Sequence, residues 1–232
     1  MPITGRNYDE GEILFIDKPY KWTSFDIVNK VKKKLKHVYE KNIKVGHAGT
    51  LDPLASGLMI ICTGKFTKRI EEFQGLVKEY TGEFYIGATT PSYDLETIAD
   101  IDNNYEVGHI TEDLVKSTAL KFKGSFEQIP PTFSAKKIDG KRAYKMARKG
   151  EDVIMRSNAV TINEFFILRQ ELPIVEFKIS CSKGTYIRSI ARDFGKELNS
   201  GAYLNSLRRT KIGDYHINDA MTIEDFCMSF EE

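Results

Sequence analysis

A short apolar run, Leu58 to Ile61, follows directly after a loop rich in glycine and proline at residues 46–57, and this pairing limits the possible folds more than any other feature of the chain. An apolar run bounded by turn residues is typical of a buried strand. The loop carries one carboxylate, Asp52. Loops of this kind beside a buried strand often present reactive groups to ligands. We therefore expect the chemistry of the protein here, although an Asp before Pro is by itself more often a turn former.

The rest of the sequence predicts a mixture of helices and strands. Thr23 and Ser24 offer an N-cap for a helix whose apolar residues recur at positions 27, 28, 31 and 35. Strands are predicted at 12–17, 58–63, 78–86, 161–168 and 174–181, and further helices at 111–121, 140–149 and 186–198. Because these elements do not form repeated strand-helix-strand units, we expect an α+β fold with a mixed, mainly antiparallel sheet. No linker or repeat divides the chain, so residues 1–232 are expected to form a single domain.

Charge is segregated along the chain, although the formal net charge is only +1. Seven lysines lie between Lys30 and Lys44, and seven basic residues lie between Lys136 and Lys149. The interval from Asp94 to Asp113 has seven acids and no Lys or Arg. This distribution is compatible with a basic groove for a polyanion, although solvated helix faces explain such patterns more often.

Cysteine, histidine and apolar patterns restrict the cellular setting. The three cysteines, at positions 62, 181 and 227, are widely spaced and predict reduced thiols. The four histidines show no metal-ligand spacing, so we expect no metal site. No apolar run approaches the roughly 18 residues needed to span a bilayer. We expect a cytoplasmic protein with no membrane partner.

Four sequence blocks, in this order, resemble the TruB family of tRNA pseudouridine-55 synthases over nearly the whole chain. The blocks are Asp17-Lys18-Pro19; Gly46 to Pro53; Gln128 to Pro131 with Ser134-Ala135 and Gly140; and Cys181 to Arg188, followed by Leu207 to Arg209. Together they are far more specific than any single block. The resemblance implies the pseudouridine synthase fold, with a bent mixed sheet, flanking helices and a central cleft for the T-stem and loop of tRNA. It implies no organic cofactor and no metal.

Many members of the family carry a C-terminal RNA-binding PUA domain after the region that matches residues 207–226. Because the sequence ends at Glu232, we do not expect a full PUA domain.

The resemblance also assigns catalytic residues. Asp52 is implied to act while the N1–C1′ bond of the target uridine breaks and the base rejoins through C5, and a carboxylate can serve near either C1′ or C6. Arg188 matches the family arginine that pairs with this aspartate and would keep it ionised. Tyr80 matches the tyrosine that stacks on the target base and handles a proton at C5. Without the resemblance, Tyr80 would be read as packing and Arg188 as an exposed helix residue.

Further residues are implied to bind the substrate. His47 matches a wedge that fills the stack when the target base is extruded. Leu207, which lies at helical spacing and would otherwise be core, matches an apolar wall of the uracil pocket. Tyr186 belongs to the fourth block and is also expected at the substrate. Phosphate contacts are expected from Lys18, Lys68 and Arg208, and less firmly from Arg209 and the lysines at 30–36.

The leading hypothesis is an isomerase that converts uridine 55 in the T-loop of tRNA to pseudouridine. The alternative is a tRNA-binding folding chaperone whose catalysis is dispensable. A third hypothesis, the catalytic subunit of a guide-RNA ribonucleoprotein, is disfavoured by the expected lack of a PUA domain. A glycosidase is disfavoured because no second carboxylate has a supporting motif. We expect a monomer that needs neither a protein partner nor a guide RNA.

Overall fold

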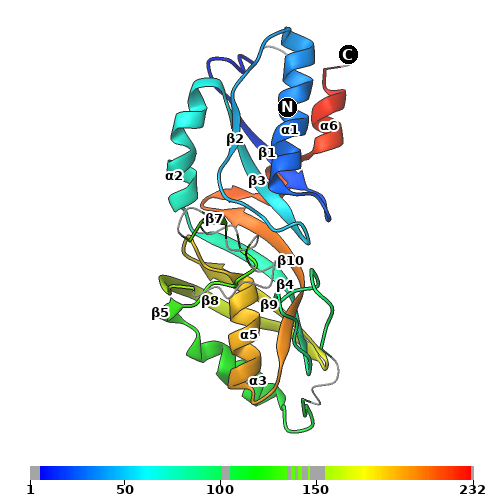
Figure 1. Cartoon of the computed structure of the whole chain (residues 1–232), viewed down its shortest axis with the longest axis vertical. Helices are drawn as coiled ribbons and strands as arrows, with labels where there is room; N and C mark the ends of the chain where they lie inside the picture. The colour runs from blue at the N-terminus through cyan, green and yellow to red at the C-terminus, as the bar shows by residue number, and fades with distance from the viewer. Residues whose placement is uncertain are drawn as a thin grey trace. The chain divides into compact units, whose positions relative to one another are not determined.

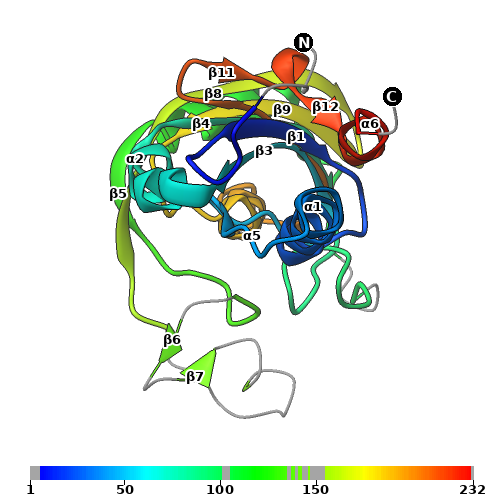
Figure 2. The same ribbon diagram turned by 90° about the horizontal axis from the view of Figure 1, so that it is seen from above.

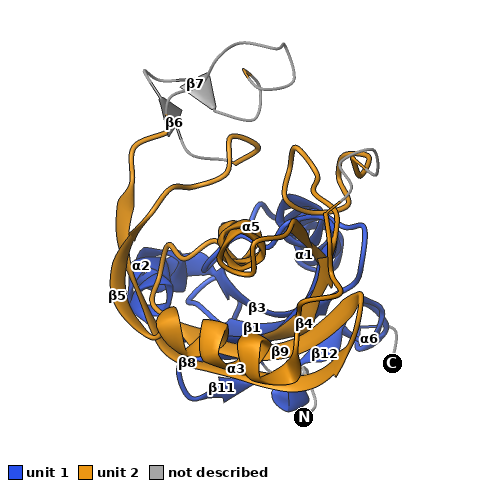
Figure 3. Cartoon of the chain, turned by 90° about the horizontal axis from the view of Figure 1, so that it is seen from below, with its two compact units in different colours: residues 1–80, 207–232 blue, residues 81–206 orange. Residues whose placement is uncertain are grey.

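The computed structural model describes residues 6–100, 105–134, 137–138, 141–142, 146 and 155–230. The chain divides into two compact units, which we call unit 1 (residues 1–80 and 207–232) and unit 2 (residues 81–206; Figure 3). The boundary falls inside two strands, β4 (Lys78–Ile86) and β10 (Ala202–Ile212), so each strand contributes residues to both units. The single domain expected from the sequence stays a prediction.

Unit 1 contains a mixed sheet and helices. Its strands, besides parts of β4 and β10, are β1 (Ile13–Lys18), β2 (Val45–His47), β3 (Ala55–Thr63), β11 (Tyr215–His216) and β12 (Met221–Thr222). Its helices are α1 (Ser24–Tyr39), α2 (Ile70–Gly75) and α6 (Ile223–Met228), with 3-10 helices η1 (Gly64–Arg69) and η2 (Ile217–Asp219). β1 and β2 pair antiparallel with β3, whereas β10 pairs parallel with β3 and β12 pairs parallel with β1. The sheet is therefore mixed, as predicted.

β3 is the buried strand predicted after the Asp52 loop, and it begins at Ala55. Its residues are buried except for the half-buried Ser56. Leu58, Ile60 and Cys62 alternate along the strand, so they lie on one face, where they form a core with Phe73 of α2. Because β3 is buried along nearly its whole length, it fixes the position of the end of the loop before it.

α1 begins where the sequence predicts. Thr23 is the N-cap: its hydroxyl accepts a hydrogen bond from the Asp26 amide at 3.1 Å, and the Asp26 carboxylate accepts one from the Thr23 amide at 2.8 Å. Ser24, the other candidate, is the first helical residue. α1 packs against α6, which lies beside it (Figures 1 and 2). The buried face of α1 consists of Ser24, Ile27, Val28, Val31 and Leu35.

Unit 2 pairs antiparallel strands with helices. Besides parts of β4 and β10, it contains β5 (Gly124–Gln128), β6 (Lys137–Ile138), β7 (Lys141–Arg142), β8 (Asn158–Glu171) and β9 (Ile174–Cys181), and the helices α3 (Glu112–Lys121) and α5 (Ile187–Glu197). β8 pairs with β5 and β9, and α3 packs against β8 and α5 (Figure 1). Aromatic rings fill the core, and the rings of Phe84 and Phe177 stack with centroids 4.2 Å apart. Phe165 and Phe194 pack around them.

Most predicted elements are confirmed in the structure, including β4 and β9 with the predicted bounds. α3 follows its N-cap Thr111, and α5 occupies the predicted helix at 186–198. The helical spacing assigned to Leu207 is wrong, because this residue lies on β10. Within the predicted helix at 140–149, Lys141–Arg142 instead form β7, Met146 is helical, and the rest lies outside the described residues. Ala135 and Gly140 of the third block also lie outside them.

These elements confirm the α+β class. Among the helices that the structure describes, none is both long and apolar enough to cross a membrane.

Candidate active site

Asp52 lies half-buried in the loop between β2 and β3 of unit 1. A turn begins at this residue, because the Ala55 amide donates a hydrogen bond to the Asp52 carbonyl at 3.1 Å. The neighbouring residue Leu51 is only 4% exposed. The carboxylate therefore projects from a segment whose backbone is itself enclosed, and three side chains from other elements hold that backbone.

Ser24, from the first turn of α1, holds the residue before Asp52. Its hydroxyl accepts a hydrogen bond from the Leu51 amide at 2.8 Å and donates one to the Leu51 carbonyl at 3.0 Å. A hydroxyl can do both because it has one donor and two acceptor positions. Both main-chain groups of this buried residue are thereby satisfied, which fixes the direction of the chain as it enters Asp52.

Lys18, the last residue of β1, holds the residue after Asp52. It has no exposed surface, and its ammonium group donates to the carbonyls of Trp22 at 2.6 Å, Pro19 at 3.0 Å and Pro53 at 3.4 Å. Burial lowers the pKa of Lys18 to about 8, and the negative charge of Asp52 acts in the opposite direction. The sequence analysis expected a phosphate contact from Lys18. The structure instead encloses its ammonium among carbonyls, which suits support of the loop.

Arg209 of β10 holds both ends of the same segment. It is 1% exposed, and its guanidinium donates to the carbonyls of Leu58 at 2.7 Å and Gly49 at 3.2 Å. Gly57 permits the close approach of β3 to β10, because a Cβ at this position would lie 2.4 Å from the Arg209 carbonyl oxygen. The loop is thus fixed by buried cations at its start and its end.

His47 lies at the end of β2, five residues before Asp52. Its Nδ1 atom is buried and has no hydrogen-bond partner among the described residues. Burial lowers the pKa of the imidazole, and the positive charge of Arg209 lowers it further. A hydrogen bond with the Gly49 backbone acts in the opposite direction, but the net lowering favours the neutral ring, which suits a side chain that would replace an uncharged base in a stack. Its wedge role stays a prediction.

The other expected residues of unit 1 differ in exposure. Arg208 makes a bidentate ion pair with Asp17, with nitrogen–oxygen distances of 3.1 and 2.6 Å, and its side chain is 41% exposed. Lys68 is exposed on η1, and Leu207 is half-buried on β10, paired in register with Ala55 of β3. Tyr80 is 9% exposed on β4. These placements leave Arg208 and Lys68 accessible to a ligand, and their roles stay predictions.

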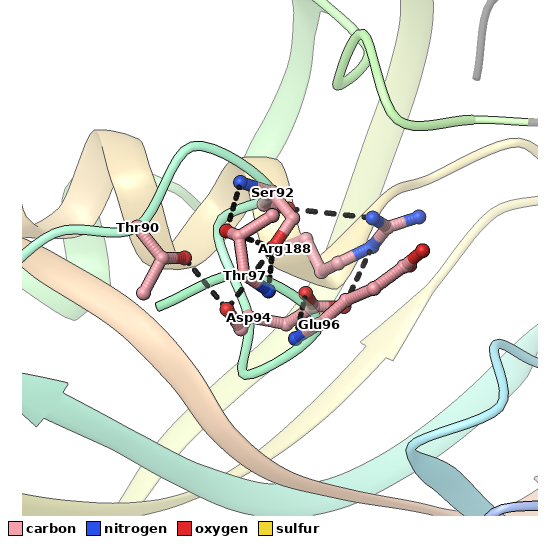
Figure 4. Close-up of polar contacts among 6 residues, drawn as sticks. All are labelled: Thr90, Ser92, Asp94, Glu96, Thr97 and Arg188. Carbon is pink, nitrogen blue, oxygen red and sulfur yellow. Dashed lines mark hydrogen bonds and ion pairs between the residues drawn. The ribbon is translucent and has the colours of Figure 1, made fainter. Parts of the chain in front are cut away.

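In unit 2, Arg188 lies in the first turn of α5 and is almost completely buried (Figure 4). Its Nε atom lies 3.6 Å from Oδ2 of Asp94, and its Nη1 atom donates to the Ser92 carbonyl at 3.3 Å. Asp94 is buried as well. From the sequence we expect an exposed arginine or one paired with Asp52, and no sequence motif points to Asp94. Pairing with Asp52 stays a prediction.

Hydroxyl side chains shape the loop that carries Asp94 (Figure 4). The Thr90 hydroxyl donates to the Asp94 carbonyl at 2.7 Å. Ser92 and Thr97 bind each other reciprocally: each hydroxyl accepts a hydrogen bond from the other residue's amide, at 3.2 and 3.0 Å. Asp94 lies among Thr and Ser residues, which favour turns. This local composition is the signal in the sequence that points to a structured loop around Asp94.

Gln128, in the third sequence block, holds the start of α5. Its amide group accepts a hydrogen bond from the Tyr186 amide at 2.8 Å and donates one to the Tyr186 carbonyl at 3.2 Å. The Ser189 hydroxyl donates to the neighbouring Ile129 carbonyl at 2.8 Å. Gln128 is 1% exposed. The third and fourth blocks are therefore in contact, and together they orient the turn that bears Tyr186 and Arg188.

Comparison with known proteins agrees with the sequence resemblance. Residues 32–187 match the model of the TruB family pseudouridylate synthase N-terminal domain, and residues 188–231 match that of the tRNA pseudouridylate synthase B C-terminal domain. A protein of Flavobacterium johnsoniae named tRNA pseudouridine synthase B is 57% identical over 97% of this chain and 98% of its own length. A protein of the same name from Phocaeicola vulgatus is 55% identical over 95% of this chain and 93% of its own length.

Solved structures show the same fold. A chain in the crystal structure of a Cbf5-Nop10-Gar1 complex superposes with a TM-score of 0.69 at 24% identity, over 95% of this chain and 54% of that one. A chain of the archaeal box H/ACA sRNP Nop10-Cbf5 complex superposes with a TM-score of 0.68 at 21% identity, over 100% of this chain and 60% of that one. This chain spans less than two thirds of either, and the likeness concerns the fold alone. From the family models and the curated relatives together, the chain belongs to the TruB family of pseudouridylate synthases.

Proposed function

We propose that the protein converts a uridine of tRNA to pseudouridine, and that the target is uridine 55 in the T-loop. The support is the name shared by relatives that are more than half identical over nearly their whole length. The structural observation that carries the proposal is the support of Asp52, whose flanking main-chain groups are bound by Ser24, Lys18 and Arg209. A carboxylate fixed in this way pre-organises a nucleophile.

The reaction that Asp52 would serve is an isomerisation. The N1–C1′ bond breaks, the uracil turns, a C5–C1′ bond forms, and the proton lost from C5 is balanced by one gained at N1. No atom is lost and no oxidant is needed, so the chain requires no cofactor for this chemistry. The Asp52 carboxylate acts as nucleophile or as a stabiliser of positive charge at the sugar. The positively charged Lys18 and Arg209 bind the loop that carries this carboxylate.

The proposal gives the other residues supporting roles in the same reaction. Tyr80 stacks on the base and handles the C5 proton, and Arg188 supplies a positive charge. His47, uncharged at pH 7, takes the place of the extruded base, while Leu207 and Tyr186 contact the nucleoside. Arg208 and Lys68, which are accessible, bind phosphates. Lys18 is assigned to loop support in place of a phosphate contact.

The decisive experiment is Asp52→Asn, which keeps the shape of the side chain and removes its charge. Purified wild type and variant are incubated with an unmodified tRNA transcript, and pseudouridine is mapped by position. We expect product formation by the variant to fall by roughly 10⁴-fold while tRNA binding stays within about twofold. Asp214→Asn, at an exposed acid of unit 1, is the matched control and should retain activity.

Several results would contradict the proposal. Normal turnover by Asp52→Asn would refute the catalytic assignment. Modification of a uridine outside the T-loop would refute the proposed target. The assay contains neither guide RNA nor protein partner, so product formed by the purified chain also supports the proposal that it needs neither. Product that appears after a guide RNA is added, and not before, would refute that part. The proposed monomeric state is tested separately, by the molar mass in solution.

A further inference from the structure

A surface that is both basic and aromatic lies on the outer side of α1. Phe25, Asn29, Lys32 and Lys36 are spaced by four, three and four residues, so they share one face of the helix, and we call them the α1 stripe. Phe25 is 65% exposed, Lys32 and Lys36 are exposed, and Asn29 is half-buried. The core contacts of α1 come from other positions, which leaves the stripe free of a packing role.

The charge on this helix is one-sided. Five lysines occupy positions 30–36, and no acidic residue lies between Asp26 and Glu40. Lys32 and Lys36 are one turn apart, and like charges at this spacing destabilise a helix by a few tenths of a kcal/mol. A solvated helix face usually mixes both signs and forms pairs at this spacing. A uniformly positive face beside an exposed aromatic ring is compatible with a polyanionic ligand.

The turn before α1 adds a second exposed aromatic side chain beside the Asp52 loop. Tyr20 is 52% exposed, and the Lys21 ammonium lies 5.7 Å from the centre of its ring. Lys21 has a φ of +69°, and its amide donates to the Pro53 carbonyl at 2.9 Å. Tyr20 and Lys21 are therefore attached to the segment that carries Asp52. Aromatic rings next to cations are the usual platform for unpaired bases of RNA.

We propose that the α1 stripe, together with Tyr20 and Lys21, binds the RNA substrate at nucleotides outside the loop that holds the target uridine. Tyr20 and Phe25 stack on bases, and Lys32 and Lys36 contact backbone phosphates. From Phe25 to Lys36 the stripe extends about 16 Å along α1, starting at the turn that contacts the Asp52 loop. Bound RNA therefore continues away from the reacting base. This inference rests on the proposed function, because it takes the substrate to be tRNA.

The test compares two substrates, a full-length tRNA transcript and the isolated T-arm hairpin. The variant is Lys32→Gln/Lys36→Gln, and its matched control is Lys123→Gln/Lys196→Gln, which removes two exposed lysines from unit 2 with the same change of net charge. For full-length tRNA, we expect the Kd of the stripe variant to rise about tenfold. The slope of log Kd against log salt should fall by about 1.5, since roughly 0.7 to 0.9 is lost with each phosphate contact. The hairpin Kd and kcat should change by less than about twofold.

A second variant, Phe25→Ala, tests the stacking contact. Loss of one stacking ring should raise the Kd for full-length tRNA by roughly five- to tenfold without changing the salt slope. Because Phe25 is exposed, the unfolding temperature of the Phe25→Ala variant should match that of wild type. This measurement separates a binding effect from a folding defect.

Each outcome decides the inference. It is overturned if the stripe variant and the unit 2 control lose the same affinity, because the effect is then one of net charge. It is also overturned if the hairpin is weakened as much as the full-length tRNA, because the contact then lies within the T-arm. Binding is measured separately from turnover. A wild type that binds tRNA but forms no pseudouridine would refute the proposed function and leave the binding comparison intact.

Discussion

Asp52 in unit 1 and Arg188 in unit 2 are supported by groups of opposite charge. Around Asp52, the buried cations Lys18 and Arg209 bind main-chain carbonyls of the loop. Around Arg188, the Asp94 carboxylate and the Ser92 carbonyl are the acceptors. In each unit, groups of charge opposite to that of the functional side chain bind either that side chain or the segment that carries it. The difference shows that each scaffold is adapted to the charge that it presents.

A second level of support is common to both regions. Ser24 binds both main-chain groups of Leu51, next to Asp52, and Gln128 binds both main-chain groups of Tyr186, two residues before Arg188. In each case a single neutral side chain fixes the backbone that carries the charged one. The charged partners should therefore dominate stability, whereas the neutral partners should mainly control position.

The largest effect is expected from Arg209→Met. The change leaves the buried carbonyl of Leu58 and the partly buried carbonyl of Gly49 without their charged donor, so the free energy of unfolding should fall by about 3–5 kcal/mol. Arg208→Met, at the neighbouring residue, is the matched control. Its ion pair with Asp17 is partly exposed, so the loss should stay below about 1 kcal/mol. Denaturant unfolding measures both, and equal losses would contradict a special role for buried cations.

The next effect is expected in unit 2, from Asp94→Asn. The variant keeps the size of the side chain but leaves the buried Arg188 without this negative charge, so we expect a loss of about 2–3 kcal/mol and a lower kcat. Thermal unfolding and single-turnover assays report the two quantities. Glu106→Gln removes an exposed acid from the same unit and should cost less than about 0.5 kcal/mol. If Asp94→Asn changes neither the free energy of unfolding nor kcat, Arg188 does not depend on this carboxylate.

Ser24→Ala and Gln128→Leu test the neutral supports. Each should cost about 1–2 kcal/mol, because a main-chain amide that is buried (Leu51) or partly buried (Tyr186) loses its acceptor. Each should also lower kcat more than it raises KM, since the side chain acts on the position of a catalytic group. Thr23→Ala removes the N-cap of α1 at a similar cost of about 1 kcal/mol, but it should leave kcat unchanged. Equal kcat losses in Ser24→Ala and Thr23→Ala would indicate a purely structural role for Ser24.

The smallest effect concerns the pH dependence of stability. The pKa of Lys18 is about 8 in the folded protein, below its ordinary value of 10.5. Between these values the unfolded chain binds up to one more proton than the folded one, so the free energy of unfolding rises with pH, whereas well below pH 8 Lys18 contributes almost no slope. From pH 7.5 to 8.5 the rise should be about 0.7 kcal/mol. Lys18→Met should remove this increment, and an unchanged profile would contradict the lowered pKa.

Local patterns explain which parts of the fold were predictable. The start of α1, the buried strand β3 and the alternating strand β9 are encoded by caps and periodicity within a few residues. β10 was missed because it carries Arg208 and Arg209, which are rarely read as sheet residues. The burial of Lys18 was missed because lysine is rarely fully buried. No window of sequence could reveal that Ser92 and Arg188, 96 positions apart, are in contact.

The Ser24–Leu51 contact links the motion of the loop to that of the helix. The amide hydrogen of Leu51 is donated to a hydroxyl inside the capped first turn of α1. It can exchange with deuterium from the solvent only when this turn releases the loop. We therefore expect the segment that carries Asp52 to open together with the first turn of α1 and not as an independent lid. The exchange rate of this one hydrogen measures how often the carboxylate leaves its working position.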